Sequence, residues 1–137
     1  MGLRRRAREA ALKILYQIEM SGYTSEECIE TYWNDLEENQ DIKEFSSFLV
    51  RGVHSLLPEI DEKIKKTAKN WLLERMHKVD LSILRMAIFE MFYTNETPYK
   101  VVINEAIELA KKYGTDESHA FVNGILDKLS KTLKKKE

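Results

Sequence analysis

The sequence predicts an all-α protein of about seven helices, arranged as two packed helical sub-bundles within a single domain. Apolar residues recur three and four positions apart along nearly the whole chain, which is the period of a helix buried on one side. No stretch keeps the strict alternation of apolar and polar residues that marks a half-buried strand. The 137 residues also include only five glycines and two prolines, too few for a loop-rich β protein.

The first two helices are separated by a predicted stop at Gly22. The apolar side expected of the first helix is Ala7, Ala10, Ala11, Ile14, Leu15 and Ile18. Thr24 and Glu27 have the spacing of a capping box, in which each side chain accepts a hydrogen bond from the backbone of the other residue, so a second helix begins there. The core side expected of this helix is Ile29, Tyr32, Trp33 and Leu36.

Pro58 separates the third helix from the fourth, because proline ends one helix and suits the first turn of the next. The third helix is expected to bury Phe45, Leu49, Val53 and Leu56. The fourth is expected to bury Ile60, Ile64, Ala68 and Trp71. The domain spans 1–137, and its two helical halves, approximately 1–57 and 58–137, are expected to meet near residues 57–60.

Three more helices complete the chain. The fifth is predicted over about 79–93, with Ile83, Leu84, Ala87, Ile88 and Met91 inside. After the turn "TNETP", a sixth has Val102, Ala106, Leu109, Ala110 and Tyr113 at helical spacing, and Gly114 stands at the position that usually ends a helix. The sequence "TDES" then caps a seventh, with Phe121, Val122, Ile125, Leu126 and Leu129.

Charge is distributed unevenly, although the net charge is only −1. The first sixteen residues carry Arg4, Arg5, Arg6, Arg8 and Lys13 against Glu9 alone. Residues 24–44 are acidic, and "KTLKKKE" at the C-terminus is basic. Such asymmetry indicates charged partners rather than fold. No apolar run approaches the ~20 residues that span a bilayer, and no signal-peptide pattern occurs. Cys28 is the single cysteine, so no intrachain disulfide can form, and we expect a reducing, cytoplasmic location.

Residues suited to catalysis are scarce. His54, His77 and His119 lack cysteine or histidine neighbours at metal-ligand spacing. Cys28 has no base nearby in sequence and is interpreted as a buried structural thiol. No glycine-rich phosphate loop and no "GxSxG" motif occurs. We therefore expect no enzyme activity, no metal and no cofactor.

The first helix has an unusual side opposite its apolar face. On a helical wheel this basic stripe is Arg5, Arg8, Leu12 and Tyr16. Positive charge at a helix start opposes the macrodipole, so the stripe suggests a surface for an anionic partner. Arginine forks bind phosphates and an exposed tyrosine stacks an unpaired base, which suits single-stranded RNA.

Three other interpretations of the basic helix compete with RNA binding. An unstructured basic arm would only keep the protein in solution. A duplex-DNA reader would need a recognition helix aimed at base edges, and none is evident. A membrane-surface helix would carry Trp or Phe on its apolar side, whereas this side is alanine and medium aliphatics.

Three stretches, "RRRAREAALKILY", "PYKVVINEAIELAKKYG" and "ESHAFVNGILDKL", resemble the NusB family of bacterial transcription antitermination factors, and "VDLSILRMAIFEM" adds weaker support. The resemblance covers most of residues 4–22 and 79–129. It implies an all-helical RNA-binding protein of two helical halves. It also implies binding of boxA-type single-stranded RNA of ribosomal leader transcripts, together with the ribosomal protein NusE. That complex helps RNA polymerase in the elongation complex to read through terminators.

The same resemblance implies which residues contact the partners. Carried over by position, the RNA-binding residues are Arg5, Arg8, Tyr16, Glu74, Tyr113, Glu117 and Phe121. Tyr113 and Glu117 stand where Phe and Asp are expected, which leaves the local geometry open, and Phe121 can equally be a core residue. Asp80 and Tyr99 are assigned to the NusE interface.

Two expectations compete with these assignments. Asn104, His119 and Asn123 lie within the matching stretches and are expected to form buried hydrogen bonds between the sixth and seventh helices rather than to touch RNA. The rival function is a helical protein–protein adaptor that does not bind RNA directly.

Overall fold

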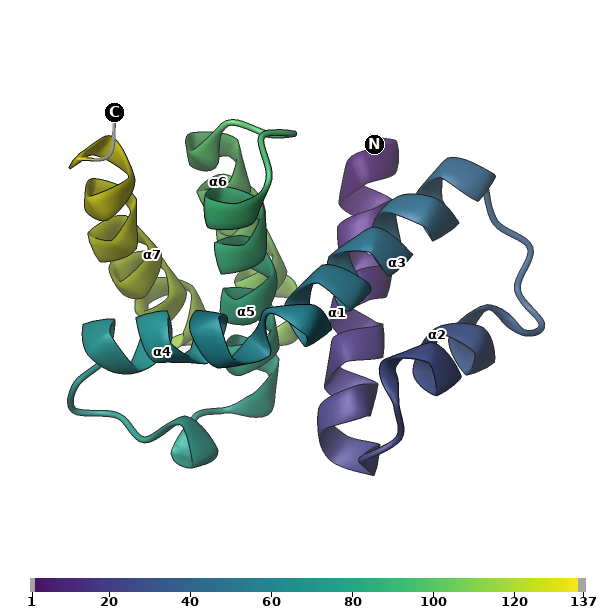
Figure 1. Ribbon diagram of the computed structural model, residues 1–137, viewed down its shortest axis with the longest axis horizontal. Coiled ribbons are helices and arrows are strands. Elements are labelled where there is room, and N and C mark those ends of the chain that lie inside the picture. Colours follow the sequence, from purple (N-terminus) through teal and green to yellow (C-terminus); the bar gives the residue numbers. More distant parts are fainter. Residues whose placement is uncertain (1, 136–137) are drawn as a thin grey trace. The chain divides into compact units, whose positions relative to one another are not determined.

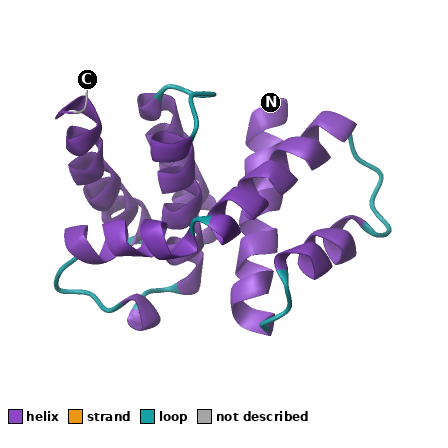
Figure 2. Cartoon of the chain, viewed as in Figure 1, coloured by secondary structure: helices purple, strands orange, loops and turns teal. Residues whose placement is uncertain are grey.

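The computed structural model describes residues 2–135, and all regular structure in this range is helical (Figures 1 and 2). The elements are α1 (Leu3–Ser21), α2 (Ser25–Trp33), α3 (Gln40–Ser55), α4 (Leu57–Thr67), the short 3-10 helix η1 (Leu73–Arg75), α5 (Lys78–Tyr93), α6 (Tyr99–Tyr113) and α7 (Ser118–Lys135). The prediction of an all-α fold with seven α-helices is confirmed for the described residues. The chain divides into two compact units, unit 1 up to Ser55 and unit 2 from Leu56 onward.

In unit 1, α1 packs against both α2 and α3. Small side chains at Ala7, Ala10 and Ala11 are buried and let α1 approach its neighbours closely. The predicted stop at Gly22 is confirmed: this residue has φ 78°, in the left-handed region that favours glycine, and its N–H donates to the Ile18 carbonyl at 3.0 Å.

Helix α2 begins with the predicted capping box. The Thr24 hydroxyl accepts from the Glu27 N–H at 3.1 Å, and the Glu27 carboxylate accepts from the Thr24 N–H at 2.9 Å. The helix ends earlier than predicted, because Leu36 lies beyond its last residue and is 50% exposed. The Leu36 N–H donates to the Trp33 carbonyl, three residues earlier, so a tight turn takes the place of the bond to the fourth residue back that would continue the helix.

In unit 2, α5 packs against α4, α6 and α7. Its residues from Asp80 to Met91 are buried apart from Arg85, which is half-buried. The Arg85 guanidinium forms two 2.9 Å hydrogen bonds to the two Asp61 carboxylate oxygens and thereby ties α5 to α4. The side chains of this ion pair are only 12% and 18% exposed.

Helix α4 begins as predicted, with Pro58 in its first turn, but stops at Thr67. Ile60, Ile64 and Ala68 are buried, whereas Trp71 lies outside the helix and is 56% exposed. The prediction of Trp71 as a core residue of this helix is therefore wrong. The Trp71 N–H bonds to the Ala68 carbonyl at 3.0 Å, so the chain has turned away before the next core position.

The connection from α6 to α7 depends on Gly114 and Ser118. Gly114 ends α6 as predicted, but with φ −93° rather than a left-handed conformation. A Cβ there would collide with the Ser118 side chain and would lie 2.8 Å from the Ala110 carbonyl oxygen. Ser118 lies close to Gly114 because its hydroxyl accepts a hydrogen bond from the Thr115 N–H at 2.9 Å. Glycine, which has no Cβ, leaves room for the Ser118 side chain at this distance.

Candidate nucleic-acid interface

The arginines of α1 are engaged with other side chains of unit 1. The Arg4 guanidinium carbon lies 3.8 Å from the centre of the Phe45 ring, a cation–π contact. The Arg8 guanidinium carbon lies 5.5 Å from the same ring. Arg6 forms two hydrogen bonds, 2.8 and 2.7 Å long, to the Glu38 carboxylate. The basic start of α1 is therefore partly a structural feature that holds α1 to α3 and to the segment before it.

The predicted basic stripe is only partly exposed. Arg8 is 4% exposed and Leu12 is 3% exposed, so the expectation that both face solvent is wrong. The helical-wheel argument placed them opposite the apolar face, but α1 is covered on more than one side because it packs against two other helices. Arg5 is half-buried, and Tyr16 is 38% exposed. Tyr16 is thus the most exposed side chain of the stripe.

In unit 2, Glu117 and Phe121 lie one helical turn apart at the start of α7. The Phe121 N–H donates to the Glu117 carbonyl at 3.2 Å, and the Glu117 side chain is exposed. Tyr113, the last residue of α6, is half-buried, with the Lys112 ammonium 5.3 Å from its ring centre. Phe121 is half-buried too, so it is neither a full core residue nor a free surface residue.

Glu74 is the remaining predicted RNA-binding residue of unit 2. It lies in η1 and its side chain is exposed. Trp71, three residues earlier, packs edge-on against Phe121, with ring centres 5.3 Å apart and an angle of 67° between the ring planes. This contact holds the segment of Glu74 against the start of α7, so Glu74, Glu117 and Phe121 belong to neighbouring elements.

The two residues assigned to the protein partner differ in exposure. Asp80 lies in the first turn of α5, where the positive end of the helix dipole favours a carboxylate, and is only 7% exposed. Its Oδ1 atom is buried without a hydrogen-bond partner. Tyr99, at the start of α6, is half-buried and lines a groove of about 320 Å³ with Lys100, Ile103, Asn104, Asp127, Ser130 and Lys131.

The three polar residues expected to be buried are not. Asn104, His119 and Asn123 are all exposed, so the prediction of buried hydrogen bonds between α6 and α7 is wrong. They lie on the outer sides of these helices, while the residues buried between them include Ala106, Leu126 and Val122. Cys28, in contrast, is 3% exposed with its sulfur 3.9 Å from the Ser21 hydroxyl, which confirms a buried thiol.

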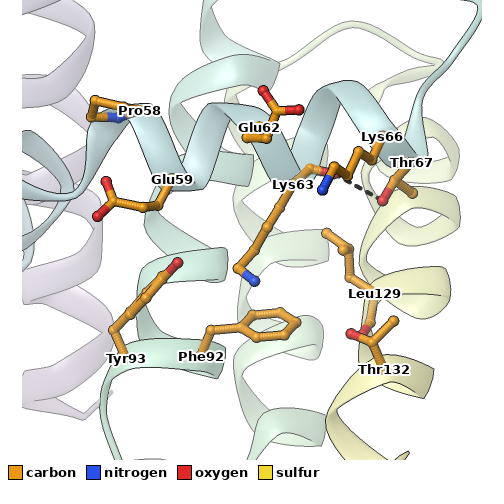
Figure 3. Close-up of a pocket in the computed structure, with 10 residues that line it drawn as sticks. All are labelled: Pro58, Glu59, Glu62, Lys63, Lys66, Thr67, Phe92, Tyr93, Leu129 and Thr132. Atoms are coloured by element: carbon orange, nitrogen blue, oxygen red, sulfur yellow. Dashed lines mark hydrogen bonds between the residues drawn. The ribbon is translucent and has the colours of Figure 1, made fainter.

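A groove of about 670 Å³ opens in unit 2 between α4, the end of α5 and α7 (Figure 3). It is lined by Pro58, Glu59, Glu62, Lys63, Lys66, Thr67, Phe92, Tyr93, Leu129 and Thr132. The Lys63 ammonium points into it and lies 4.4 Å from the centre of the Phe92 ring and 5.9 Å from that of Tyr93. None of the residues assigned to RNA or to NusE lines this groove.

Burial affects the titration of one side chain of this groove, Tyr93. Desolvation, aided by the nearby Glu59 carboxylate, raises the pKa of the Tyr93 hydroxyl. Among residues 2–135, no cluster of three His, Cys, Asp or Glu side chains could hold a metal ion. No helix in this part of the chain is long and apolar enough to cross a membrane.

The structure is thus an all-helical fold with Tyr16 exposed in unit 1, and with Glu74 and Glu117 exposed near Phe121 in unit 2. Aromatic side chains of these types stack unpaired bases in single-stranded nucleic-acid-binding proteins. The model of the NusB family matches residues 5–131, so the chain belongs to that family.

Individual relatives agree over nearly the whole chain. The transcription antitermination protein NusB of Myxococcus xanthus is 46% identical over 98% of this chain and 99% of its own length. A crystal structure of T. maritima NusB superposes with a TM-score of 0.86 at 38% identity, covering 93% of this chain and 90% of the other. The antitermination factor structure of NusB and NusE in complex with dsRNA matches with a TM-score of 0.88 at 26% identity, covering 96% of this chain and 98% of that one.

Proposed function

We propose that this protein is a transcription antitermination factor that binds boxA-type single-stranded RNA together with NusE and thereby promotes ribosomal RNA transcription. It acts in the cytoplasm within the elongation complex of RNA polymerase, and it acts by binding, without catalysing a reaction. The observation that carries the proposal is the family match over residues 5–131, which includes all the residues assigned to RNA and to NusE. The related complex of NusB with NusE and dsRNA supports RNA and NusE as partners.

The assigned side chains have distinct roles in this proposal. Tyr16, Tyr113 and Phe121 offer ring faces on which unpaired bases stack. Glu74 and Glu117 are exposed carboxylates that accept hydrogen bonds from exocyclic amines of bases. The stacking roles require bases that are not paired in a duplex.

The two assigned arginines divide the electrostatic work. Arg5 is half-buried and forks onto a phosphate. Arg8 is only 4% exposed, so it contributes positive potential from below the surface rather than a direct phosphate contact. The two arginines therefore do not make equivalent contacts with the RNA.

The central test is fluorescence anisotropy of a labelled boxA-type oligoribonucleotide titrated with the protein, with and without NusE. A gain in affinity of about tenfold with NusE supports the adaptor role, since that is a coupling free energy of about 1.4 kcal/mol. A scrambled single strand of equal length, an RNA duplex and a DNA duplex are the controls. Binding of NusE unaffected by RNA, with no RNA binding by the protein itself, would establish the protein–protein adaptor instead.

The NusE interface is tested at Tyr99 rather than at Asp80. Because Asp80 is buried, replacing it by lysine would disturb folding as well as any interface. Tyr99→Ala is expected to weaken NusE binding, while Arg5→Ala leaves NusE binding nearly unchanged. Loss of the NusE complex in Arg5→Ala alone would contradict the proposed separation of the two surfaces.

A further inference from the structure

The segment between α4 and α5 presents an exposed tryptophan that no role yet explains. Trp71 is 56% exposed and its neighbour Leu72 is 57% exposed. Together they place two large apolar side chains at adjacent exposed positions. Trp71 is not isolated, because its ring packs edge-on against Phe121, one of the residues assigned to RNA.

The backbone around Trp71 is anchored on both sides. Ala68 before it is 6% exposed and Met76 after it is 4% exposed. The Ala68 N–H bonds to the Ile64 carbonyl at 2.8 Å, and the Met76 N–H bonds to the Leu73 carbonyl at 3.1 Å. Trp71 is therefore presented from a turn that lies between two buried residues.

The surroundings of Trp71 suit RNA better than a protein. Lys69, Asn70, Glu74 and Arg75 are all exposed along the same short segment. The centre of a protein interface is depleted of charged residues. Single-stranded nucleic acid, in contrast, is bound by aromatic faces flanked by cations.

We propose that Trp71 is a base-stacking residue of the RNA-binding surface, adjacent to Phe121. This inference rests on the proposed function and adds a residue that the family resemblance did not supply. The ring planes of Trp71 and Phe121 meet at 67°, so one flat base cannot stack on both. The two rings therefore hold two different bases, turned away from each other, which requires a single strand.

The direct test is the fluorescence of Trp71 in the full chain. The sequence has two tryptophans, so Trp33→Phe leaves Trp71 as the single reporter. This change is conservative, because phenylalanine keeps an aromatic ring next to the Tyr32 ring, 4.8 Å between ring centres, and the Lys43 ammonium, 5.8 Å from the Trp33 ring centre. Unlabelled boxA-type RNA is expected to quench Trp71 with the same midpoint as the anisotropy titration. Trp71→Phe, which keeps only Trp33 in unit 1, is expected to show little quenching.

Affinity measurements separate stacking from apolar contact. Trp71→Leu keeps apolar bulk beside Phe121 but removes the flat ring, and it is expected to weaken RNA binding roughly 5- to 150-fold, the range for one stacked base. Leu72→Ala is the matched control, because Leu72 is equally exposed but has no ring face, and its RNA affinity is expected to stay within about twofold of the original. Thermal melts check that both variants fold.

A further variant distinguishes direct stacking from positioning of Phe121. In a Phe121→Leu, Trp33→Phe background, RNA at saturating concentration still quenches Trp71 if a base stacks on it. If Trp71 only orients Phe121, this quenching is absent, and the inference is wrong.

The outcomes for the inference and for the proposed function are distinguishable. Normal RNA binding without Trp71 quenching, and with full affinity in Trp71→Leu, would overturn the inference alone. No RNA binding by the unchanged protein would overturn both. Equal loss of NusE binding in Trp71→Leu and Leu72→Ala, with RNA binding intact, would make this patch a protein-docking surface instead.

Discussion

Arg8 in unit 1 and Trp71 in unit 2 reverse the usual relation between side-chain type and burial. Arg8 is charged and 4% exposed, with its guanidinium near the Phe45 ring. Trp71 is large and aromatic and 56% exposed, with one edge against Phe121. In each case an aromatic ring lies close to the side chain. The comparison shows that charge does not by itself identify a binding surface, and that an aromatic residue does not by itself identify a core.

The largest expected effect concerns Arg85, the enclosed arginine of unit 2. Its pair with Asp61 is 12% and 18% exposed, so Asp61→Ala leaves a poorly solvated cation without its carboxylate. We expect the free energy of unfolding to fall by about 3 kcal/mol, measured by urea denaturation. Glu62→Ala, at the exposed next position of α4, is the control and should change stability by no more than about 0.5 kcal/mol. Equal effects of the two changes would mean that the pair is not structural.

A smaller loss is expected at Arg8, whose buried guanidinium lies 5.5 Å from the centre of the Phe45 ring. Arg8→Ala removes a buried aliphatic stem and the contact of its charge with Phe45. We expect a loss of about 2 kcal/mol in the free energy of unfolding. Arg5→Ala on the same helix, with a half-buried side chain, should lose less than about 1 kcal/mol. An unchanged melt of Arg8→Ala would show that its burial has no energetic weight and would restore it as a candidate phosphate ligand.

The helices and the burial of Arg8 show how much of the structure the sequence could predict. Helical periodicity predicted the helices, and residue types at their ends predicted the capping box at Thr24 and the ends at Gly22 and Gly114, because these features depend on local backbone chemistry. Burial of Arg8 depends on which helices cover α1, and the sequence alone does not specify that packing.

The same limit applies to the second half of the candidate site. Trp71 continued the apolar spacing of α4, but the helix ends at Thr67, four residues earlier. The early end moves Trp71 from the expected core to the surface. Asn104, His119 and Asn123 were expected to be buried because they lie within stretches that match the family closely. Such a match does not tell which side of a helix a residue occupies, and all three are exposed.

Within α1, Arg5 is less buried than Arg8, the other arginine assigned to RNA, and is therefore the one expected to contact a phosphate. If it holds one phosphate, Arg5→Ala should flatten the slope of log affinity for single-stranded RNA against log salt by about 0.7. Tyr16→Ala should instead weaken binding by roughly 1–3 kcal/mol through lost stacking, with little change in slope. The measurement is a titration of both variants across a salt series. Unchanged binding in both folded variants would reduce the arginine-rich start of α1 to a structural and solubilising role.

The smallest expected effect is the acid response of the exposed ion pairs of unit 1. The Arg51 guanidinium, through a hydrogen bond, lowers the pKa of the Glu26 carboxyl, and the Asn39 backbone N–H together with Arg6 lowers that of Glu38. A carboxyl whose pKa is lower in the folded state stabilises the fold above its unfolded-state pKa. That contribution is lost as the pH falls below about 4.5, the ordinary value, and through the folded-state pKa. Exposure and solvent screening keep it small.

Glu26→Gln with Glu38→Gln tests this response. At pH 7 the double variant should melt slightly below the original protein, and the difference should shrink as the pH is lowered towards 3, because both proteins then lack these two charges. The melt is followed in a Trp71→Phe background, where Trp33 reports on unit 1. Raising the salt concentration at pH 7 should also narrow the gap, since exposed pairs are screened. A difference in melting temperature that persists at pH 3 would mean that the two glutamates stabilise unit 1 through packing or helix capping rather than through charge. These acidic side chains would then resemble Arg8, whose contribution to stability is assigned to packing.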